Sequence, residues 1–265
     1  MASPCGGTAG DGTRMKLALV TAGFHRIGAV IAARLAREGW ALALHSRSDA
    51  EPDADLAIAL HASQTRWHGF SADLSEGDAV NQLLPRVHAR FGRYPDLIVN
   101  NASRFVWDDP ATVTPEALAV HHAVNVAAPV MLSCALAALV GERGTASVVN
   151  ILDQRIRQPN GDQLSYTLSK QALAAATETL ARALAPQVRV NGVAPGLTLP
   201  TPDYRPAQMA ALEAAMPLAL LPDPDDIADA VLWLAQAQAT TGQIIFVDGG
   251  ANLKSFARDF VFMGE

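Results

Sequence analysis

The sequence is poor in cysteine, in charged residues and in long apolar runs, and each scarcity excludes a class of protein. Cys5 and Cys134 are the only cysteines in 265 residues, which excludes a disulfide framework and a cysteine-ligated zinc site and indicates a reducing compartment. A formal net charge of −6 gives no long-range attraction to nucleic acid or to an anionic membrane. The longest apolar stretch, 127–140, is too short and too interrupted to span a membrane. We therefore expect a soluble, cytoplasmic protein without a metal site, whose partner is a small molecule.

Residues 1–14 are small, polar and glycine-rich, and they lack the apolar core of a signal peptide. We expect them to form a disordered tail. The chain as a whole is 50% hydrophobic, which is ample for one core. No internal repeat or low-complexity linker divides residues 15–265, so a single domain is predicted there.

Short apolar runs alternate with longer segments of helical periodicity. Lys16–Thr21 has no polar alternation, which is typical of a strand covered on both faces. The helical pattern from Arg26 to Glu38 stops at Gly39, a common C-terminal signal. Strands separated by helix-length segments predict an α/β, Rossmann-like, doubly wound domain with a seven-stranded parallel sheet and helices on both faces. The remaining expected strands are 41–45, 66–70, 96–100, 147–152, 188–193 and 243–247, and the remaining expected helices are 76–91, 115–140 and 164–185.

The turn Thr21–Gly28 joins the first expected strand to the first expected helix. Gly23 and Gly28 allow a pyrophosphate to approach the backbone, and the N–H groups of the helix N-terminus face it. Taken alone, the turn is also compatible with tight packing and no ligand.

Basic residues near this turn favour NADPH over NADH. His25 and Arg26 lie within the turn, and His45–Ser48 (HSRS) follows the second expected strand. An NAD enzyme usually has an acidic residue there for the ribose 2′-hydroxyl, whereas the Arg47 guanidinium between two serine hydroxyls suits a 2′-phosphate. A solvated charged loop is the alternative interpretation.

Seven short motifs, in order and at suitable spacing, resemble those of the short-chain dehydrogenase/reductase family between about Lys16 and Leu253. They are Thr21–Gly28 for the glycine-rich loop, Ala72–Leu74 (ADL) for the adenine contact, Asn100–Ser103 (NNAS), the helix asparagine Asn125, Tyr166–Lys170 (YxxxK), Asn191–Gly196 (NGVAPG) and Asp248–Gly250 (DGG). Ala22 stands where the loop's first glycine usually lies, so we expect a slightly different turn.

The resemblance implies which residues contact the nucleotide. They are Thr21, Gly23, His25, Arg26, Ile27, Gly28, His45, Ser46, Arg47, Ser48, Asp73, Leu74, Asn101, Ala102, Ser103, Tyr166, Lys170, Pro195, Gly196 and Leu197.

Tyr166 and Lys170 are four residues apart, so on a helix their side chains share one face. A nearby ammonium favours a phenolate, and we expect it to lower the pKa of Tyr166 toward the range useful for catalysis. An ordinary amphipathic helix with an exposed lysine would show the same spacing. In the family this lysine also holds the nicotinamide ribose and the tyrosine moves the proton; the resemblance makes Asn125 a further catalytic residue.

One departure from the family pattern is informative. The family usually has serine thirteen residues before the tyrosine, where this chain has Asp153. A carboxyl group can donate a proton if burial or charge raises its pKa. An Asp–Tyr–Lys set resembles the pteridine reductase branch, which includes dihydromonapterin reductases. Phe105 and Ser103 fit that branch's NNASxF motif, whose ring stacks on the pterin while the serine contacts cofactor and substrate.

Other segments near the expected site leave alternatives open. Asp153 could be a tolerated exchange, and Phe105 a core or lid residue. Arg155 and Arg157 could favour an anionic substrate. Residues 195–206 have the length of an active-site lid, the aromatic segment 255–265 could cover the site or a subunit interface, Trp107 could line the pocket, and His121 and His122 are interpreted as surface or packing residues.

Three functions follow from these features. The first is an NADPH-dependent reductase that moves hydride to a pterin-like C=N bond, with Asp153, Tyr166, Lys170 and Asn125 in catalysis and Ser103, Phe105, Asp153 and Tyr166 at the substrate. The second is a carbonyl reductase acting on a ketone or sugar, and the third is a catalytically silent NADPH-binding sensor. The family resemblance implies a homodimer or homotetramer formed through helices 115–140 and 165–185.

Overall fold

A computed structural model describes residues 14–141, 145–199 and 204–263 of the chain. The predicted tail therefore lies outside the described residues except for Arg14, which pairs with Asp96. Seven parallel strands form one sheet in the order β3-β2-β1-β4-β5-β6-β7, which confirms the predicted α/β fold. The strand order reverses between β1 and β4, and ligands of such sheets bind beyond the carboxyl ends of the strands at this point. The strands are β1 Leu17–Val20, β2 Ala41–Ser46, β3 Trp67–Ser71, β4 Leu97–Asn100, β5 Ala146–Ile151, β6 Val188–Pro195 and β7 Ile244–Val247.

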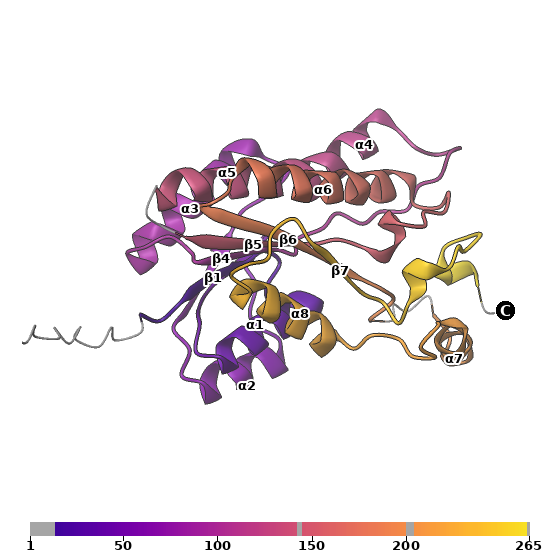
Figure 1. Ribbon diagram of the computed structural model, residues 1–265, viewed down its shortest axis with the longest axis horizontal. Helices are drawn as coiled ribbons and strands as arrows, with labels where there is room; N and C mark the ends of the chain where they lie inside the picture. The colour runs from indigo at the N-terminus through magenta and orange to yellow at the C-terminus, as the bar shows by residue number, and fades with distance from the viewer. Residues whose placement is uncertain (1–13, 142–144, 200–203, 264–265) are drawn as a thin grey trace, which may run out of the picture.

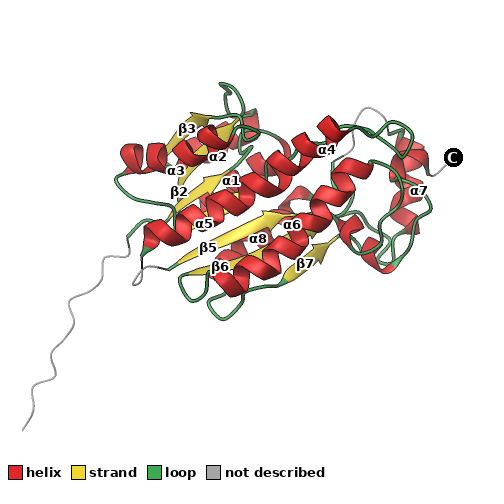
Figure 2. Ribbon diagram, turned by 90° about the horizontal axis from the view of Figure 1, so that it is seen from above, coloured by secondary structure: helices red, strands yellow, loops and turns green. Residues whose placement is uncertain are grey.

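Helices cover both faces of the sheet (Figure 1). One face carries α1 (Arg26–Arg37), α2 (Ala54–Ala62) and α8 (Pro224–Gln236), and the other carries α3 (Gly77–Phe91), α4 (Pro115–His122), α5 (Ala128–Val140) and α6 (Leu164–Ala183). Helix α7 (Pro206–Ala215) and the C-terminal segment lie together at one end of the molecule, beyond α6 and β7 (Figure 2). The short helical turns are η1 Ala123–Ala127, η2 Gln154–Ile156, η3 Ala251–Leu253 and η4 Phe260–Phe262.

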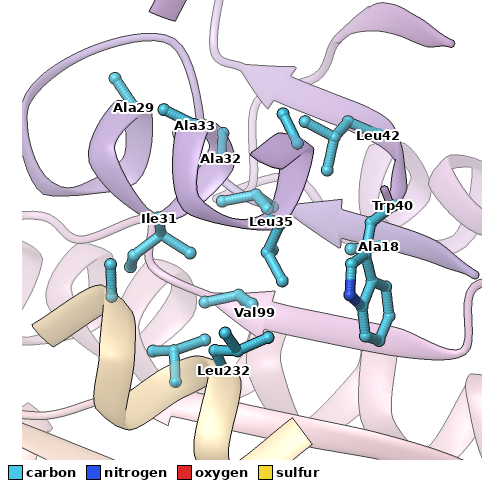
Figure 3. Close-up of a cluster of buried hydrophobic side chains, with 14 of the residues drawn as sticks. Ala18, Ala29, Ile31, Ala32, Ala33, Leu35, Trp40, Leu42, Val99 and Leu232 are labelled. Atoms are coloured by element: carbon cyan, nitrogen blue, oxygen red, sulfur yellow. The ribbon is translucent and has the colours of Figure 1, made fainter. Parts of the chain in front are cut away.

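The packing on both faces of strand β1 explains why its sequence has no polar alternation. Ala18 and Val20 belong to the apolar cluster beneath α1, whereas Leu17 and Leu19 belong to the cluster on the opposite face. Figure 3 shows the first cluster, in which Ile31 of α1 lies near side chains from the sheet and from α8. Each fully buried side chain of this size contributes about 1.5–3 kcal/mol. Both clusters together hold β1 and its turn rigidly at the switch point.

The helical stretch predicted at 115–140 is interrupted in the structure. A π-helical turn, η1, separates α4 from α5. Pro129 follows it, and a proline ring disrupts the regular helical hydrogen bond to residue 125. Pro115–Val140 is nevertheless the one described stretch long and apolar enough to cross a membrane. It is a core helix of the α/β domain, because Leu132 and Leu136 of α5 are buried against the sheet.

Candidate active site

A cavity of about 1130 Å³ opens at the carboxyl ends of the strands. This volume exceeds the roughly 300–1,000 Å³ typical of a site for one small ligand, so it has room for a dinucleotide and a substrate together. Its walls come from the loops that follow β1, β2, β4, β5 and β6, from α6 and from the C-terminal segment, with residues in the ranges 22–28, 46–50, 101–107, 151–155, 163–170, 195–199 and 259–262, and Tyr204.

The side chains of Asn101 and His45 hold the turn after β1. The Asn101 side-chain amide donates to the carbonyls of Thr21 and Ala22, at 3.0 and 3.1 Å. His45 Nδ1 accepts from the Ala22 N–H at 3.3 Å, while Nε2 lies 2.9 Å from the Ala72 carbonyl and donates to it. Burial lowers the pKa of His45, which favours this neutral tautomer. Thr21 and His45 therefore support the turn rather than line the cavity.

The turn keeps the shape that a glycine at position 22 would allow. Ala22 has φ = 50°, a left-handed conformation that costs a non-glycine residue about 1–2 kcal/mol. At Gly28 a Cβ atom would lie 2.0 Å from the Ala22 carbonyl oxygen, so only glycine fits. The departure at position 22 therefore adds strain and leaves the close approach of the backbone intact.

The end of the cavity next to the loops that follow β1 and β2 carries positive charge. Arg26 and Arg47 line it, together with Ser46 and Ser48. Neither guanidinium forms an ion pair within residues 14–141, 145–199 and 204–263. Free guanidiniums beside hydroxyl groups fit a phosphate on the ribose, so this end of the cavity fits NADP.

Some of the residues expected to contact the cofactor line the cavity, and others do not. His25, Arg26, Ile27, Gly28, Ser46, Arg47, Ser48, Asn101, Ser103, Tyr166, Lys170, Pro195, Gly196 and Leu197 line the cavity. Thr21, Gly23, His45, Asp73, Leu74 and Ala102 lie outside its lining. The Asp73 carboxylate accepts bonds from the hydroxyl and N–H of Ser75, which lower its pKa; its contact with adenine stays a prediction. The lid predicted at 195–206 includes residues 200–203, which lie outside the described residues.

Asp153, Tyr166 and Lys170 come together in the cavity wall. The Tyr166 hydroxyl donates to Asp153 Oδ2 at 2.9 Å. One turn along α6, Lys170 Nζ donates to the Ile151 carbonyl at 2.8 Å and lies 5.6 Å from the centre of the Tyr166 ring. This is the shared helix face that the four-residue spacing predicts.

The protonation of this group differs from the expectation. Burial, followed by the Asp153 carboxylate, raises the pKa of Tyr166 well above its ordinary value. Burial lowers the pKa of Lys170 to about 8. The predicted lowering of the Tyr166 pKa is therefore wrong for this structure, because burial and a carboxylate in the serine position outweigh the Arg155 guanidinium, which lowers it. The phenol therefore keeps its proton at neutral pH.

Arg155 is not free to bind an anionic substrate, contrary to the expectation. It is buried, and its Nε and NH2 groups pair with Asp153 Oδ1 at 3.1 Å and with Asp259 Oδ2 at 2.7 Å. Its NH1 group donates to Gln163 Oε1 at 2.6 Å. Burial lowers the pKa of Arg155, but Asp153, Tyr166 and Asp259 raise it by more, so the guanidinium stays charged. Its carbon Cζ lies 5.3 Å from the centre of the Tyr166 ring.

The C-terminal segment covers the site, as one of the two sequence alternatives expected. Asp259, Phe260, Val261 and Phe262 line the cavity. The sequence reasoning missed Asp259 and Gln163 as parts of the site. The signal available was an acidic residue within an otherwise aromatic segment, Arg258–Phe262 (RDFVF).

Asn125, expected in catalysis, holds the loop that follows β4. Its Oδ1 accepts from the Arg104 N–H at 2.6 Å, and its Nδ2 donates to the Arg104 carbonyl and to Ser169 Oγ. It is fully buried and outside the cavity lining. Phe105, which follows Arg104 in the loop, lines the cavity and meets the Tyr166 ring edge to face, with ring centres 4.6 Å apart. Asn125 is therefore a positioning residue in this structure.

No cluster of three metal-ligating side chains occurs among the residues whose placement is described.

Comparisons with known proteins agree with this geometry. A family model described as enoyl-(acyl carrier protein) reductase matches residues 22–252. A protein of Streptomyces violaceoruber, named ketoacyl reductase 2 of the granaticin polyketide synthase, is 35% identical over 252 residues, which cover 92% of this chain and 98% of that protein. The chain belongs to the short-chain dehydrogenase/reductase family. As a short-chain dehydrogenase/reductase it is an oxidoreductase that uses a nicotinamide dinucleotide.

Two solved structures are similar to this short-chain dehydrogenase/reductase over nearly its whole length. The crystal structure of FolM alternative dihydrofolate reductase 1 from Brucella canis, complexed with NADP, is 34% identical and superposes with a TM-score of 0.83, covering 94% of this chain and 98% of that one. The corresponding protein of Brucella suis, also with NADP, is 34% identical with a TM-score of 0.81. These neighbours confirm the resemblance to the pteridine reductase branch. A (3R)-3-hydroxyacyl-CoA dehydrogenase of Mus musculus is 31% identical, covering 89% of this chain and 96% of that protein.

Proposed function

We propose that this enzyme reduces a C=N bond of a dihydropterin with NADPH and forms a tetrahydropterin. The observation that carries the proposal is the hydrogen bond between Tyr166 and Asp153, with the Phe105 ring set against the same tyrosine. Asp153 stands where the family usually has serine. The two Brucella structures, whose titles name alternative dihydrofolate reductases, support a pterin ring as the substrate.

The residues that line the cavity support one placement of the cofactor. Arg26 and Arg47 would bind the 2′-phosphate, and the turn at Gly28 would admit the pyrophosphate. Lys170 and Tyr166 would hold the nicotinamide ribose, as the family resemblance implies. When bound, NADPH supplies the hydride.

Reduction of the C=N bond adds a hydride to carbon and a proton to nitrogen. Tyr166 would donate this proton, and Arg155, which lowers the pKa of Tyr166 against burial and Asp153, would make the donation easier. The phenolate left behind would lie near Arg155 and Lys170, both cationic at neutral pH. Asp153 pairs with Arg155 and accepts the hydrogen bond of the Tyr166 hydroxyl, so we assign Asp153 to accepting and relaying a proton to Tyr166 rather than to being the first donor.

Phe105 would bind the substrate by stacking. Its side chain is 53% exposed although it lines the cavity, and its edge-to-face contact with Tyr166 places it at the proton donor. A flat heterocycle prefers an offset stacked or edge-to-face arrangement with such a ring, worth about 0.5–1.5 kcal/mol beyond the area buried. Ser103, also in the cavity lining, would contact both cofactor and substrate.

A ketone reductase is the second candidate, since relatives are named as a ketoacyl reductase and a hydroxyacyl-CoA dehydrogenase. Asp153→Ser separates the two functions. A ketone reductase would keep much of its activity in this variant, whereas a pterin reductase that needs the carboxylate relay would lose most of it.

We also propose that the enzyme assembles as a dimer or tetramer. Helices α4 to α6 expose several apolar side chains, which a subunit interface would bury: Leu118, Val120, Leu139 and Leu168. The molar mass from light scattering tests this assembly.

The test of function mixes the purified enzyme with NADPH and a dihydropterin, a quinonoid pterin or one of several ketones, and follows loss of the reduced nicotinamide. We expect oxidation with a pterin, and much slower oxidation with NADH. Turnover of ketones alone would leave the fold and cofactor standing and refute the pterin assignment. Tight NADPH binding without any turnover would favour the sensor.

A further inference from the structure

Gln154 is a buried polar residue in the wall of the cavity. It follows Asp153 in the turn η2 and lines the cavity, although it is only 6% exposed. Its amide oxygen Oε1 is buried and accepts no hydrogen bond within the part of the chain that the structure describes. A buried polar atom without a partner destabilises a protein, and in a binding cavity it indicates a contact that the ligand completes.

The polar side chains next to Gln154 in the chain are already engaged. Asp153 accepts from the Tyr166 hydroxyl through Oδ2, and from the N–H and Nε of Arg155 through Oδ1. The Arg155 guanidinium is held by three side chains of the protein, as described above. In the stretch 152–155 of the cavity wall, the amide of Gln154 is therefore the group left to bind a polar edge of the ligand.

The aromatic residues of the cavity leave the edges of a flat ligand unrecognised. Phe105 and Trp107 line the cavity from the loop that follows β4. Stacking on such rings holds the plane of a heterocycle but distinguishes its polar edges poorly. Recognition of an edge requires a donor and an acceptor at fixed positions, and a side-chain amide carries both in one plane.

A dihydropterin has a suitable polar edge beside the bond that is reduced. Its pyrimidinone ring carries a lactam, in which N3–H is a donor and the C4 carbonyl is an acceptor. This carbonyl is the neighbour of N5, the nitrogen that takes the proton when the N5=C6 bond is reduced. Gln154 follows the residue that is bonded to Tyr166, the proposed proton donor, so it can meet the lactam while Tyr166 meets N5. Amide side chains pair with such donor–acceptor edges through two parallel hydrogen bonds, as they do with adenine.

We propose that Gln154 is a specificity-determining residue, whose amide accepts from N3–H and donates to the C4 carbonyl of the substrate. The enzyme then selects rings with an unsubstituted lactam beside the reacting C=N bond, whatever substituent C6 carries. Because the amide oxygen has no partner among the described residues, Gln154 also contributes less to folding than an apolar side chain of the same length would. This inference rests on the proposed function.

The first test measures KM for two dihydropterins that differ only by a methyl group on N3. Gln154→Met keeps the length of the side chain and removes both hydrogen-bonding groups. It should raise the KM of the parent dihydropterin about ten-fold, the loss of two neutral hydrogen bonds. The value of kcat should stay within about two-fold, because the amide takes no part in moving the proton.

Methylation of N3 removes the same contact from the substrate. It should raise the KM of the wild type about ten-fold and change that of Gln154→Met by less than about two-fold, because two changes that delete one interaction are not additive. Gln238→Met is the matched control, since Gln238 is exposed and outside the cavity lining, and it should behave as the wild type with both substrates.

Thermal unfolding of the free enzyme gives a second readout that does not need turnover. Gln154→Met should raise the thermal midpoint by about 2–4 °C, because it removes a buried polar group that has no partner. Gln208→Met is the opposite case and should lower the midpoint, since Gln208 is buried and its Nε2 donates to three carbonyls, those of Phe260, Val261 and Met263.

The outcomes separate the role of Gln154 from the proposed function. An unchanged KM in Gln154→Met, an N3-methyl effect that persists in this variant, or a lowered thermal midpoint would each overturn the lactam contact while the proposed function stands. If the wild-type enzyme turns over no dihydropterin, the proposed function fails, and the lactam contact fails with it.

Discussion

Arg155 is the residue whose replacement tests the charge balance of the site most sharply. It pairs with Asp153 beside Tyr166 and with Asp259 in the C-terminal segment. Arg155→Met keeps the length of the side chain and removes the charge. The Asp153 carboxylate would then raise the pKa of Tyr166 without opposition, because Arg155 lowers it in the native protein. The phenol should become a weaker acid and proton donation slower.

The separation of Arg155 from Tyr166 sets the size of the effect. We take 5.3 Å, the distance from the guanidinium carbon to the centre of the ring, as the separation of the charges. At this separation and an effective dielectric constant of about 20, a guanidinium stabilises a phenolate by about 3 kcal/mol, or about two pKa units. We expect kcat for dihydropterin reduction to fall about ten-fold if the proton is half transferred in the transition state, and about a hundred-fold if it is fully transferred. Arg157→Met is the matched control, because Arg157 contacts Asn252 and the Phe246 ring and lies outside the cavity lining. It should retain wild-type turnover.

Loss of Arg155 also leaves Asp259 buried without its partner, which costs about 3–5 kcal/mol of stability. Asp259→Asn in the same chain removes that unpaired charge. Arg155→Met/Asp259→Asn should therefore regain most of the thermal midpoint while turnover stays low. Full activity in Arg155→Met, or activity that returns together with stability in the double variant, would refute the role assigned to the guanidinium.

Three further predictions concern separate parts of the site. Arg47→Ala should raise the KM for NADPH at least ten-fold and leave the KM for NADH unchanged, because a charge-assisted hydrogen bond to phosphate contributes about 1.5–3 kcal/mol. An equal rise in KM for both cofactors would contradict the 2′-phosphate assignment. Because the pKa of Lys170 is lowered to about 8, its ammonium is present below that pH and lost above it, so kcat should fall as pH rises through about 8. Lys170→Arg should move this decline to higher pH. If the pH profile does not move, the decline belongs to another group. Ala22→Gly relieves the left-handed alanine and should raise the free energy of unfolding by up to about 1 kcal/mol in a denaturant titration with unchanged KM for NADPH; a loss of stability would show that the turn is unstrained.

Sequence patterns correctly predicted those helices and strands whose formation depends on residues close together in the chain. The uninterrupted apolar run of β1 indicated a strand with two covered faces, and its side chains do alternate between two clusters. Tyr166 and Lys170 share a helix face because a four-residue spacing is one helical turn. Helices α2, α7 and α8 were not predicted, although Asp223 and Pro224 at the start of α8 form an ordinary N-terminal capping signal. Helix α2 is short and rich in alanine, with no clear apolar face.

The ionisation of the site could not be read from the sequence in the same way. Arg155 and Asp259 are 104 residues apart, and their pairing depends on how the C-terminal segment packs against α7. In the sequence alone, Arg155 resembles a cation that is free to bind a substrate, and Asp153 resembles a carboxyl group without a charged partner. The raised pKa of Tyr166 likewise follows from burial, which only the assembled cavity provides.

The most direct test of the proposed reaction follows the hydride itself. The enzyme is incubated with a dihydropterin and NADPH deuterated at C4 of the nicotinamide, and the tetrahydropterin is analysed by mass spectrometry and NMR. We predict one deuterium on the carbon of the reduced C=N bond, and no product with Tyr166→Phe above a small residual rate. Unlabelled tetrahydropterin, or deuterium found only in the alcohol product of a ketone, would contradict hydride transfer to a pterin.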